Sequence, residues 1–130
     1  MVIPLDPSQE RDFIAEQDRD LEAAEQTVFK VRSLTATERS VVEDNAISQG
    51  ADGEQRLRSG SMLVAALHLG LVTWENFPPG GPDLPFRSKG RGLGRKVSEK
   101  TLSAIPPDIR QEIAAEILNG STLSEDDAKN

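Results

Sequence analysis

The residue types that most often carry out chemistry in proteins are scarce in this chain. His68 is the only histidine and cysteine is absent, so neither a paired-histidine metal site nor a thiolate site can form. His68 lies among Met62, Leu67 and Leu69, which favours a buried or partly buried structural histidine. We therefore predict no catalytic residue, no metal and no cofactor, and expect that the protein is not an enzyme.

The 22 acidic side chains are the remaining candidates for general acid–base chemistry. A catalytic carboxylate pair needs fixed positions and environments that push the two pKa values apart. Here the acids lie mostly toward the two ends of the chain, away from its apolar centre at residues 54–69. The sequence favours solvated acidic faces over a catalytic pair.

Residues 90–96, Gly-Arg-Gly-Leu-Gly-Arg-Lys, have the composition of a phosphate-binding loop but not its pattern. A dinucleotide fingerprint needs a preceding strand and a helix that begins at the third glycine, and a P-loop needs Gly-Lys followed by Ser or Thr. Neither condition is met. We interpret the segment as a flexible basic loop whose partner is an acidic protein surface or nucleic acid.

The charge of the chain is unevenly distributed around a net value of −7. Residues 1–26 hold eight acids against Arg11 and Arg19, whereas residues 87–96 hold five basic residues and no acid. Such asymmetry is typical of interaction surfaces, and the two segments can meet each other or matching patches on neighbouring chains. Nucleic-acid binding is the less favoured alternative, because the chain is acidic overall and no aromatic residues are interleaved with the basic ones.

Aromatic residues beside the Pro/Gly turn at residues 78–82 are the other candidates for an interface. They suit apolar anchors at a docking site, while packing at the end of a helix is the alternative reading. The predicted partner-binding residues are the aromatic and basic side chains of this region: Trp74, Phe77, Phe86, Arg87, Lys89, Arg91, Arg95 and Lys96.

Local patterns predict the elements that position these residues. Residues 27–33 alternate as a strand, whose mate is residues 84–87 or the sheet edge of a neighbouring protein. Thr35 and Glu38 have the spacing of a capping box, which predicts a helix to about residue 48. A second helix is expected over about residues 54–69. Ser98 is expected to cap a short helix and Pro107 to open the final helix, which Gly120 ends.

We therefore predict a mostly α fold, a small helical domain of three to four helices with one short strand or hairpin and extended terminal arms. Residues 1–26 form an acidic extended arm, in which Ser8 caps a short helix through Glu16. Residues 27–120 form the helical domain, including the basic Gly-rich loop 87–97, and residues 121–130 form an acidic tail. No signal peptide or membrane span is expected, which predicts a cytosolic origin and no membrane partner.

Three internal segments and the C-terminal end together resemble a known group of proteins. The segments are Val-Phe-Lys-Val-Arg-Ser-Leu-Thr at 28–35, Gly-Leu-Val-Thr-Trp-Glu-Asn-Phe at 70–77, Leu-Pro-Phe at 84–86 and Leu-Ser-Glu-Asp-Asp-Ala-Lys-Asn at 123–130. Over residues 20–130 the chain resembles small proteins encoded in tailed-bacteriophage morphogenesis regions.

The resemblance implies a non-enzymatic structural protein of the phage particle, located in the virion and assembled in the host cytoplasm. Its expected position is the tail, neck or capsid, where several copies dock on other phage structural proteins in a symmetric assembly. A tail assembly chaperone that is absent from the mature virion is the alternative. A second alternative is an accessory protein that contacts nucleic acid through the basic loop.

Overall fold

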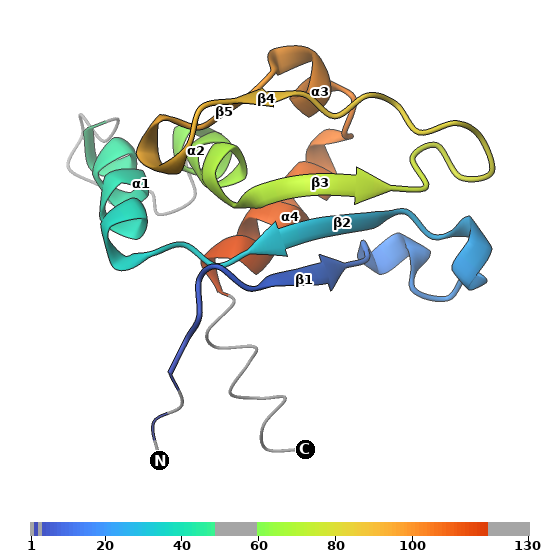
Figure 1. Ribbon diagram of the computed structural model, residues 1–130, viewed down its shortest axis with the longest axis horizontal. Coiled ribbons are helices and arrows are strands. Elements are labelled where there is room, and N and C mark those ends of the chain that lie inside the picture. The colour runs from blue at the N-terminus through green and yellow to red at the C-terminus, as the bar shows by residue number, and fades with distance from the viewer. Residues whose placement is uncertain (1, 3, 49–59, 120–130) are drawn as a thin grey trace.

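The computed structural model describes residues 2, 4–48 and 60–119, which form an α+β domain (Figure 1). Its main sheet is antiparallel, with strands β1 (Glu10–Phe13), β2 (Val28–Arg32) and β3 (Leu71–Glu75) in the order β1-β2-β3. Between β1 and β2 the chain forms two 3-10 helices, η1 (Glu16–Asp18) and η2 (Ala23–Glu25). A second sheet is a two-stranded hairpin of β4 (Ser88–Lys89) and β5 (Lys96–Val97).

Alternation along β2 separates the two faces of the main sheet. Phe29 and Val31 are buried toward α4, whereas Val28, Lys30 and Arg32 on the other face are half-buried. The pairing register sets Phe13 opposite Phe29, and Phe29 opposite Trp74, so a row of buried aromatic side chains crosses all three strands. This row gives the sheet an apolar face that the helices cover.

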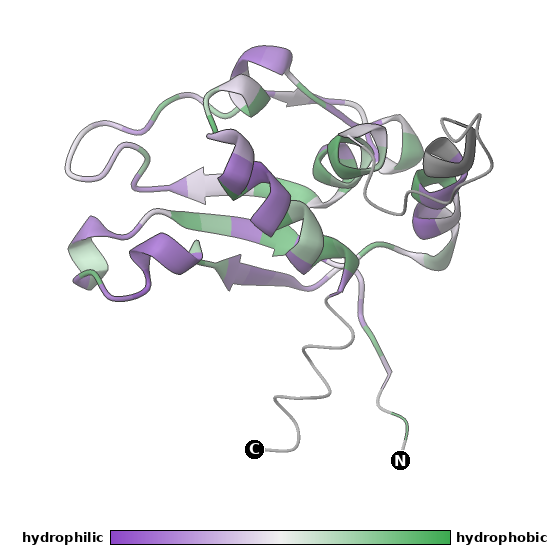
Figure 2. Cartoon of the chain, turned by 180° about the vertical axis from the view of Figure 1, so that it is seen from behind, coloured by the Kyte–Doolittle hydropathy of each residue, from purple (hydrophilic) through white to green (hydrophobic). Residues whose placement is uncertain are grey.

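The four helices are α1 (Ala36–Ser48), α2 (Gly60–Gly70), α3 (Glu99–Ser103) and α4 (Pro107–Leu118). Helix α4 lies behind the sheet and packs against α2, while α2 runs directly into β3 (Figure 1). Seen from behind, much of β2 and the start of β3 are apolar, and β1 with the two short helices after it is mostly hydrophilic (Figure 2). The core therefore lies between α2, α4 and the strands β2 and β3.

Three of the predicted helix starts are confirmed. The Thr35 hydroxyl accepts from the Glu38 N–H at 3.1 Å, and Glu38 Oε1 accepts from the Thr35 N–H at 2.9 Å, which completes the capping box at α1. Ser98 caps α3 by accepting from the Thr101 N–H, and Pro107 is the first residue of α4. These signals are local in sequence, so they hold whatever the tertiary structure is.

The prediction of a mostly α fold with one short strand or hairpin is wrong. Residues expected to start a helix after Ser8 form β1 instead, and residues 71–75, for which no strand was predicted, form β3. The mates of β2 are thus β1 and β3, not residues 84–87. Strands of four or five residues with mixed burial carry too little periodicity to reveal pairing partners distant in sequence.

The expected extended arm and flexible loop also differ from what the structure shows. Residues 10–26 belong to the domain, because Arg11 Nε contacts Glu116 Oε2 on α4 at 2.7 Å and Arg11 Nη1 donates to Ser33 Oγ at 2.9 Å. The basic loop 87–97 is a paired hairpin. Residues 54–59 of the predicted second helix, Gly120 and the tail 121–130 lie outside the described residues. In the part of the chain that is described, no helix has the length and apolarity needed to cross a membrane.

Gly70 is the point where α2 passes closest to α4. A Cβ at this position would lie 2.5 Å from Cγ2 and 2.9 Å from Cδ1 of Ile117, and Ile117 is only 1% exposed. Both residues are enclosed, so the isoleucine has little room to move. The absence of a side chain at Gly70 therefore sets the distance between the two helices.

We expect Gly70→Ala to lower the free energy of unfolding by about 1–3 kcal/mol, because overpacking forces side chains or backbone to shift. Chemical denaturation followed by circular dichroism measures the change. Gly60→Ala is the matched control, since a Cβ there meets nothing within 4 Å. Equal stability of the two variants would show that α2 and α4 are not in this close contact.

Candidate functional site

The basic hairpin, residues 87–97, is the candidate functional site. Ser88 pairs with Val97 and Lys89 with Lys96, and the 3-10 helix η3 (Gly92–Gly94) forms the tip. Gly90 has φ +80°, and a Cβ there would lie 2.7 Å from the Gly94 carbonyl oxygen, so this turn requires glycine. Strands of two residues are too short to be stable alone, and the hairpin depends on contacts with the rest of the domain.

Arg95 supplies the most extensive of these contacts, because its side chain points inward. Its Nη1 donates to the carbonyl oxygens of His68 at 2.9 Å and Leu71 at 2.6 Å, and its Nη2 donates to that of Val72 at 3.3 Å. These acceptors lie at the junction of α2 and β3, where carbonyl groups lack helical partners. Burial, and to a lesser degree the charge on Arg32, lowers the pKa of Arg95 from its ordinary value.

His68 makes the second connection. Its Nδ1 accepts a hydrogen bond from the Val97 N–H at 2.9 Å, a contact that requires the neutral imidazole at that nitrogen. Burial lowers the pKa of His68, and the neighbouring charges on Lys96 and Arg95 lower it further. The structural role expected for this histidine is therefore what the structure shows.

The other four basic residues of the hairpin are exposed. Four of the described Arg and Lys side chains outside the hairpin have acidic partners, such as Lys30 with Asp12 at 2.5 Å and Arg39 with Glu43 at 3.4 Å, whereas Arg19, Lys100 and Arg110 are scattered and form no ion pair among the described residues. Among the described residues, no carboxylate forms an ion pair with any of the four: Arg87, Lys89, Arg91 and Lys96. The hairpin is thus a concentrated positive surface on an acidic protein.

A hollow of about 610 Å³ lies on this surface. Aromatic, hydroxyl and basic side chains line it: Phe86, Arg87, Ser88, Lys89, Lys96 and Ser98. Two further hydrogen bonds shape its wall, from the Ser98 N–H to the Arg87 carbonyl oxygen at 2.9 Å and from the Arg87 N–H to Thr101 Oγ1 at 3.2 Å. The hollow combines positive charge, hydroxyl donors and one aromatic ring, which suits a carboxylate-bearing partner.

The predicted aromatic residues form a cluster next to the hairpin. The Trp74 ring centroid is 4.9 Å from that of Phe77 and 5.0 Å from that of Phe86, with edge-to-face geometry in both pairs. Trp74 is only 4% exposed and its Nε1 donates to the Leu84 carbonyl oxygen at 2.8 Å. Phe77 and Phe86 are half-buried, so these two rings, rather than Trp74, present a surface to a partner.

The structure thus divides the eight predicted partner-binding residues into two groups. Trp74 and Arg95 have inward-facing side chains whose polar groups are occupied within the domain. The remaining six lie at or beside the hairpin with side chains at least partly accessible: Phe77, Phe86, Arg87, Lys89, Arg91 and Lys96. Their role in partner binding stays a prediction.

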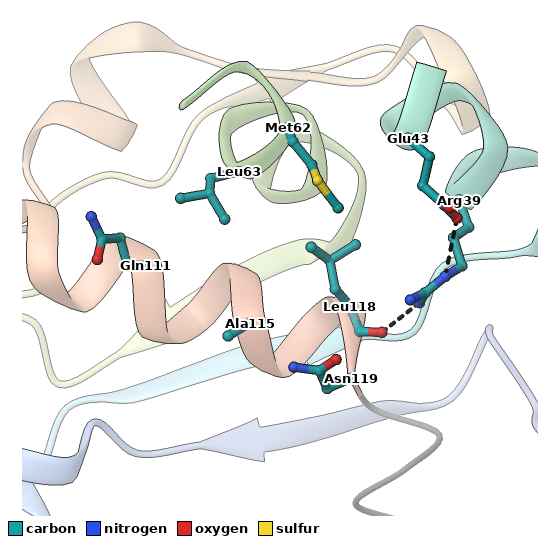
Figure 3. A pocket seen from close by; sticks show the side chains of 8 residues that line it. All are labelled: Arg39, Glu43, Met62, Leu63, Gln111, Ala115, Leu118 and Asn119. Carbon is teal, nitrogen blue, oxygen red and sulfur yellow. Dashed lines mark hydrogen bonds and ion pairs between the residues drawn. The ribbon is translucent and has the colours of Figure 1, made fainter. Parts of the chain in front are cut away.

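A second hollow, of about 370 Å³, was not predicted from the sequence. It lies where α1, α2 and α4 meet, and Met62, Leu63 and Leu118 form much of its apolar lining (Figure 3). Arg39 closes one side by donating to the Leu118 carbonyl oxygen and pairing with Glu43 (Figure 3). Three helices that are distant in sequence create this hollow, so no local pattern predicts it. Only the Arg39–Glu43 ion pair on its wall has a spacing, four residues along a helix, that the sequence reveals.

Comparison with known proteins finds no matching protein-family model, no similar curated protein and no similar solved structure. Within residues 2, 4–48 and 60–119, no group of three or more histidine and acidic side chains is arranged to hold a metal ion. The geometry and charge of the basic hairpin are therefore the features that point to a function.

We expect the stability of the protein to fall as the pH drops from about 7 to about 5.5, because His68 has a lower pKa when folded than its ordinary value of 6.5. In this range the unfolded chain binds a proton that the folded chain does not. The Arg32 guanidinium, as the chief cause, holds the pKa of Glu38 below its ordinary value of 4.5. The contribution of Glu38 to the free energy of unfolding is therefore constant between about pH 7 and about pH 5.5. Denaturation at several pH values measures the slope.

His68→Asn is the comparison variant. The side-chain oxygen of the introduced asparagine can accept a hydrogen bond from the Val97 N–H, but asparagine does not titrate. The variant should lose the part of the pH dependence that His68 causes. Identical slopes in the two proteins would contradict a lowered pKa for His68.

Proposed function

We propose that this chain is a non-enzymatic docking protein, a structural component of a tailed-phage particle at its tail, neck or capsid. The basic hairpin binds an acidic surface of a neighbouring protein subunit in the particle. The observation that carries the proposal is the set of exposed hairpin cations without an ion-pair partner among the described residues. Because the backbone of the hairpin is anchored, binding a partner does not require the segment itself to become ordered.

Charge and composition favour a protein partner over nucleic acid. The net charge of −7 disfavours the approach of a phosphate backbone to the protein as a whole. Only Phe86 adds an aromatic ring to the hollow, whereas proteins that bind single strands use several rings on which successive bases stack. A local positive surface on an acidic protein instead suits docking in one orientation.

The assignment to a phage particle rests on the resemblance of sequence segments. In the fold, residues 28–35 form β2 and the start of the capping box, and residues 70–77 form β3 and its turn. Residues 84–86 pack on Trp74 and lead into the hairpin. Two of the four resembling segments, 70–77 and 84–86, thus adjoin the docking surface and 28–35 lies in the sheet beside them, which supports the proposal; segment 123–130 lies outside the described residues.

Quantitative mass spectrometry of purified particles of the encoding phage tests the location. We expect a fixed copy number per particle. Presence in infected lysate together with absence from particles would contradict the virion assignment and favour the assembly chaperone.

The docking surface has its own test in the same phage. Lys89→Gln with Lys96→Gln should reduce incorporation about tenfold, because each lost exposed charge contact weakens binding by up to about 1 kcal/mol. Arg19→Gln with Arg110→Gln is the matched control, since it removes the same charge from side chains that do not line the hairpin hollow. Equal incorporation of the two double variants would exclude the hairpin as the docking surface.

A further inference from the structure

Residues 10–25, here called the acidic edge, carry the charge opposite to that of the basic hairpin. Their two cations are occupied within the domain. Arg11 contacts Glu116 and Ser33, and Arg19 donates to the Ile14 carbonyl oxygen at 3.1 Å with its guanidinium 5.9 Å from the centre of the Phe13 ring. The exposed carboxylates that remain, without an ion pair among the described residues, are Glu10, Glu16, Asp20, Glu22 and Glu25.

The acidic edge is held in a defined shape. Asn76 Nδ2 donates to the carbonyl oxygens of Ala24 at 2.8 Å and Gln26 at 2.9 Å, and Glu112 Oε1 accepts from the Glu16 N–H at 2.9 Å. Strand β1 pairs only with β2 in the described part of the chain, so its outer backbone groups face away from the sheet. An unpaired strand edge offers main-chain hydrogen bonds in addition to charge.

The two charged surfaces cannot meet within one chain. In the sheet order β1-β2-β3, the acidic edge lies on the β1 side, and the basic hairpin lies beyond β3 (Figure 1). Arg95 fixes the hairpin to the start of β3, and Arg11 fixes β1 to α4. Both surfaces are thus anchored on opposite sides of the same domain.

We infer that the acidic surface bound by the basic hairpin belongs to a second copy of this chain, so that copies associate head to tail. This inference rests on the proposed function, since a particle component present in several copies needs contacts between them. The contact joins two different surfaces and is therefore heterologous, which produces a ring if the rotation closes and a filament if it does not. Charge complementarity favours this orientation, because it sets the exposed cations of the hairpin against five exposed carboxylates that have no ion pair among the described residues.

Sedimentation velocity of the purified full chain over a range of concentrations is the first measurement. At about 0.05 M salt the mean sedimentation coefficient should rise with concentration, and at about 0.5 M salt it should not, because exposed charges are then screened. Monomers at every concentration in low salt would overturn the inference.

Charge reversal provides the second measurement. The hairpin variant carries Lys89→Glu, Arg91→Glu and Lys96→Glu, and the edge variant carries Asp20→Lys, Glu22→Lys and Glu25→Lys; all six side chains are exposed. Each variant alone should be monomeric, and an equimolar mixture should associate again. Circular dichroism shows that each variant is folded.

A chain with all six reversals has the net charge of the original and should self-associate, although it should not join the original chain. Failure of both the mixture and the six-fold variant to associate would overturn the inference. In that case the incorporation assay separates the two proposals. If the hairpin substitutions still reduce incorporation into particles, the proposed function stands and the hairpin has a different acidic partner. If they leave incorporation unchanged, the proposed function fails as well.

Discussion

The contact of Arg95 with the junction of α2 and β3 is the interaction on which the candidate site depends. A hairpin of two-residue strands with three glycines at residues 90, 92 and 94 has little stability of its own. Hydrogen bonds from a charged donor contribute about 1.5–3 kcal/mol each, and Arg95 donates to three carbonyl groups. One basic residue is thus used to fix the segment, and the other four are presented to solvent.

Arg11 has the corresponding role on the opposite side of the sheet. Its guanidinium binds both the carboxylate and the carbonyl oxygen of Glu116, and so ties β1 to α4. Because Arg11 is used internally, it does not neutralise the carboxylates around it. The two arginines together explain how a small acidic domain keeps one positive and one negative surface apart.

Much of the helical structure could be predicted from the sequence, because its signals are local. The Thr35–Glu38 capping box, the Ser98 cap and the position of Pro107 each act within one helical turn. The strands β1 and β3 could not be predicted, because pairing between Phe13 and Phe29 or between Phe29 and Trp74 spans many residues. The position of the candidate site was predicted, but not the inward direction of Arg95, since the carbonyl groups that bind it come from a different part of the chain.

Amide hydrogen exchange tests most directly whether the docking surface is held in place by Arg95. The N–H groups of Val97 and Ser98 donate to His68 Nδ1 and to the Arg87 carbonyl oxygen, so they should exchange at least roughly tenfold more slowly than those of Gly92 and Leu93 at the tip. Arg95→Met should remove that difference and leave the amides of β2 unchanged. Two results would contradict a surface anchored by Arg95. The first is exchange at Val97 and Ser98 that is as fast as at the tip in the original protein. The second is exchange at these two amides that is as slow in the Arg95→Met variant as in the original protein.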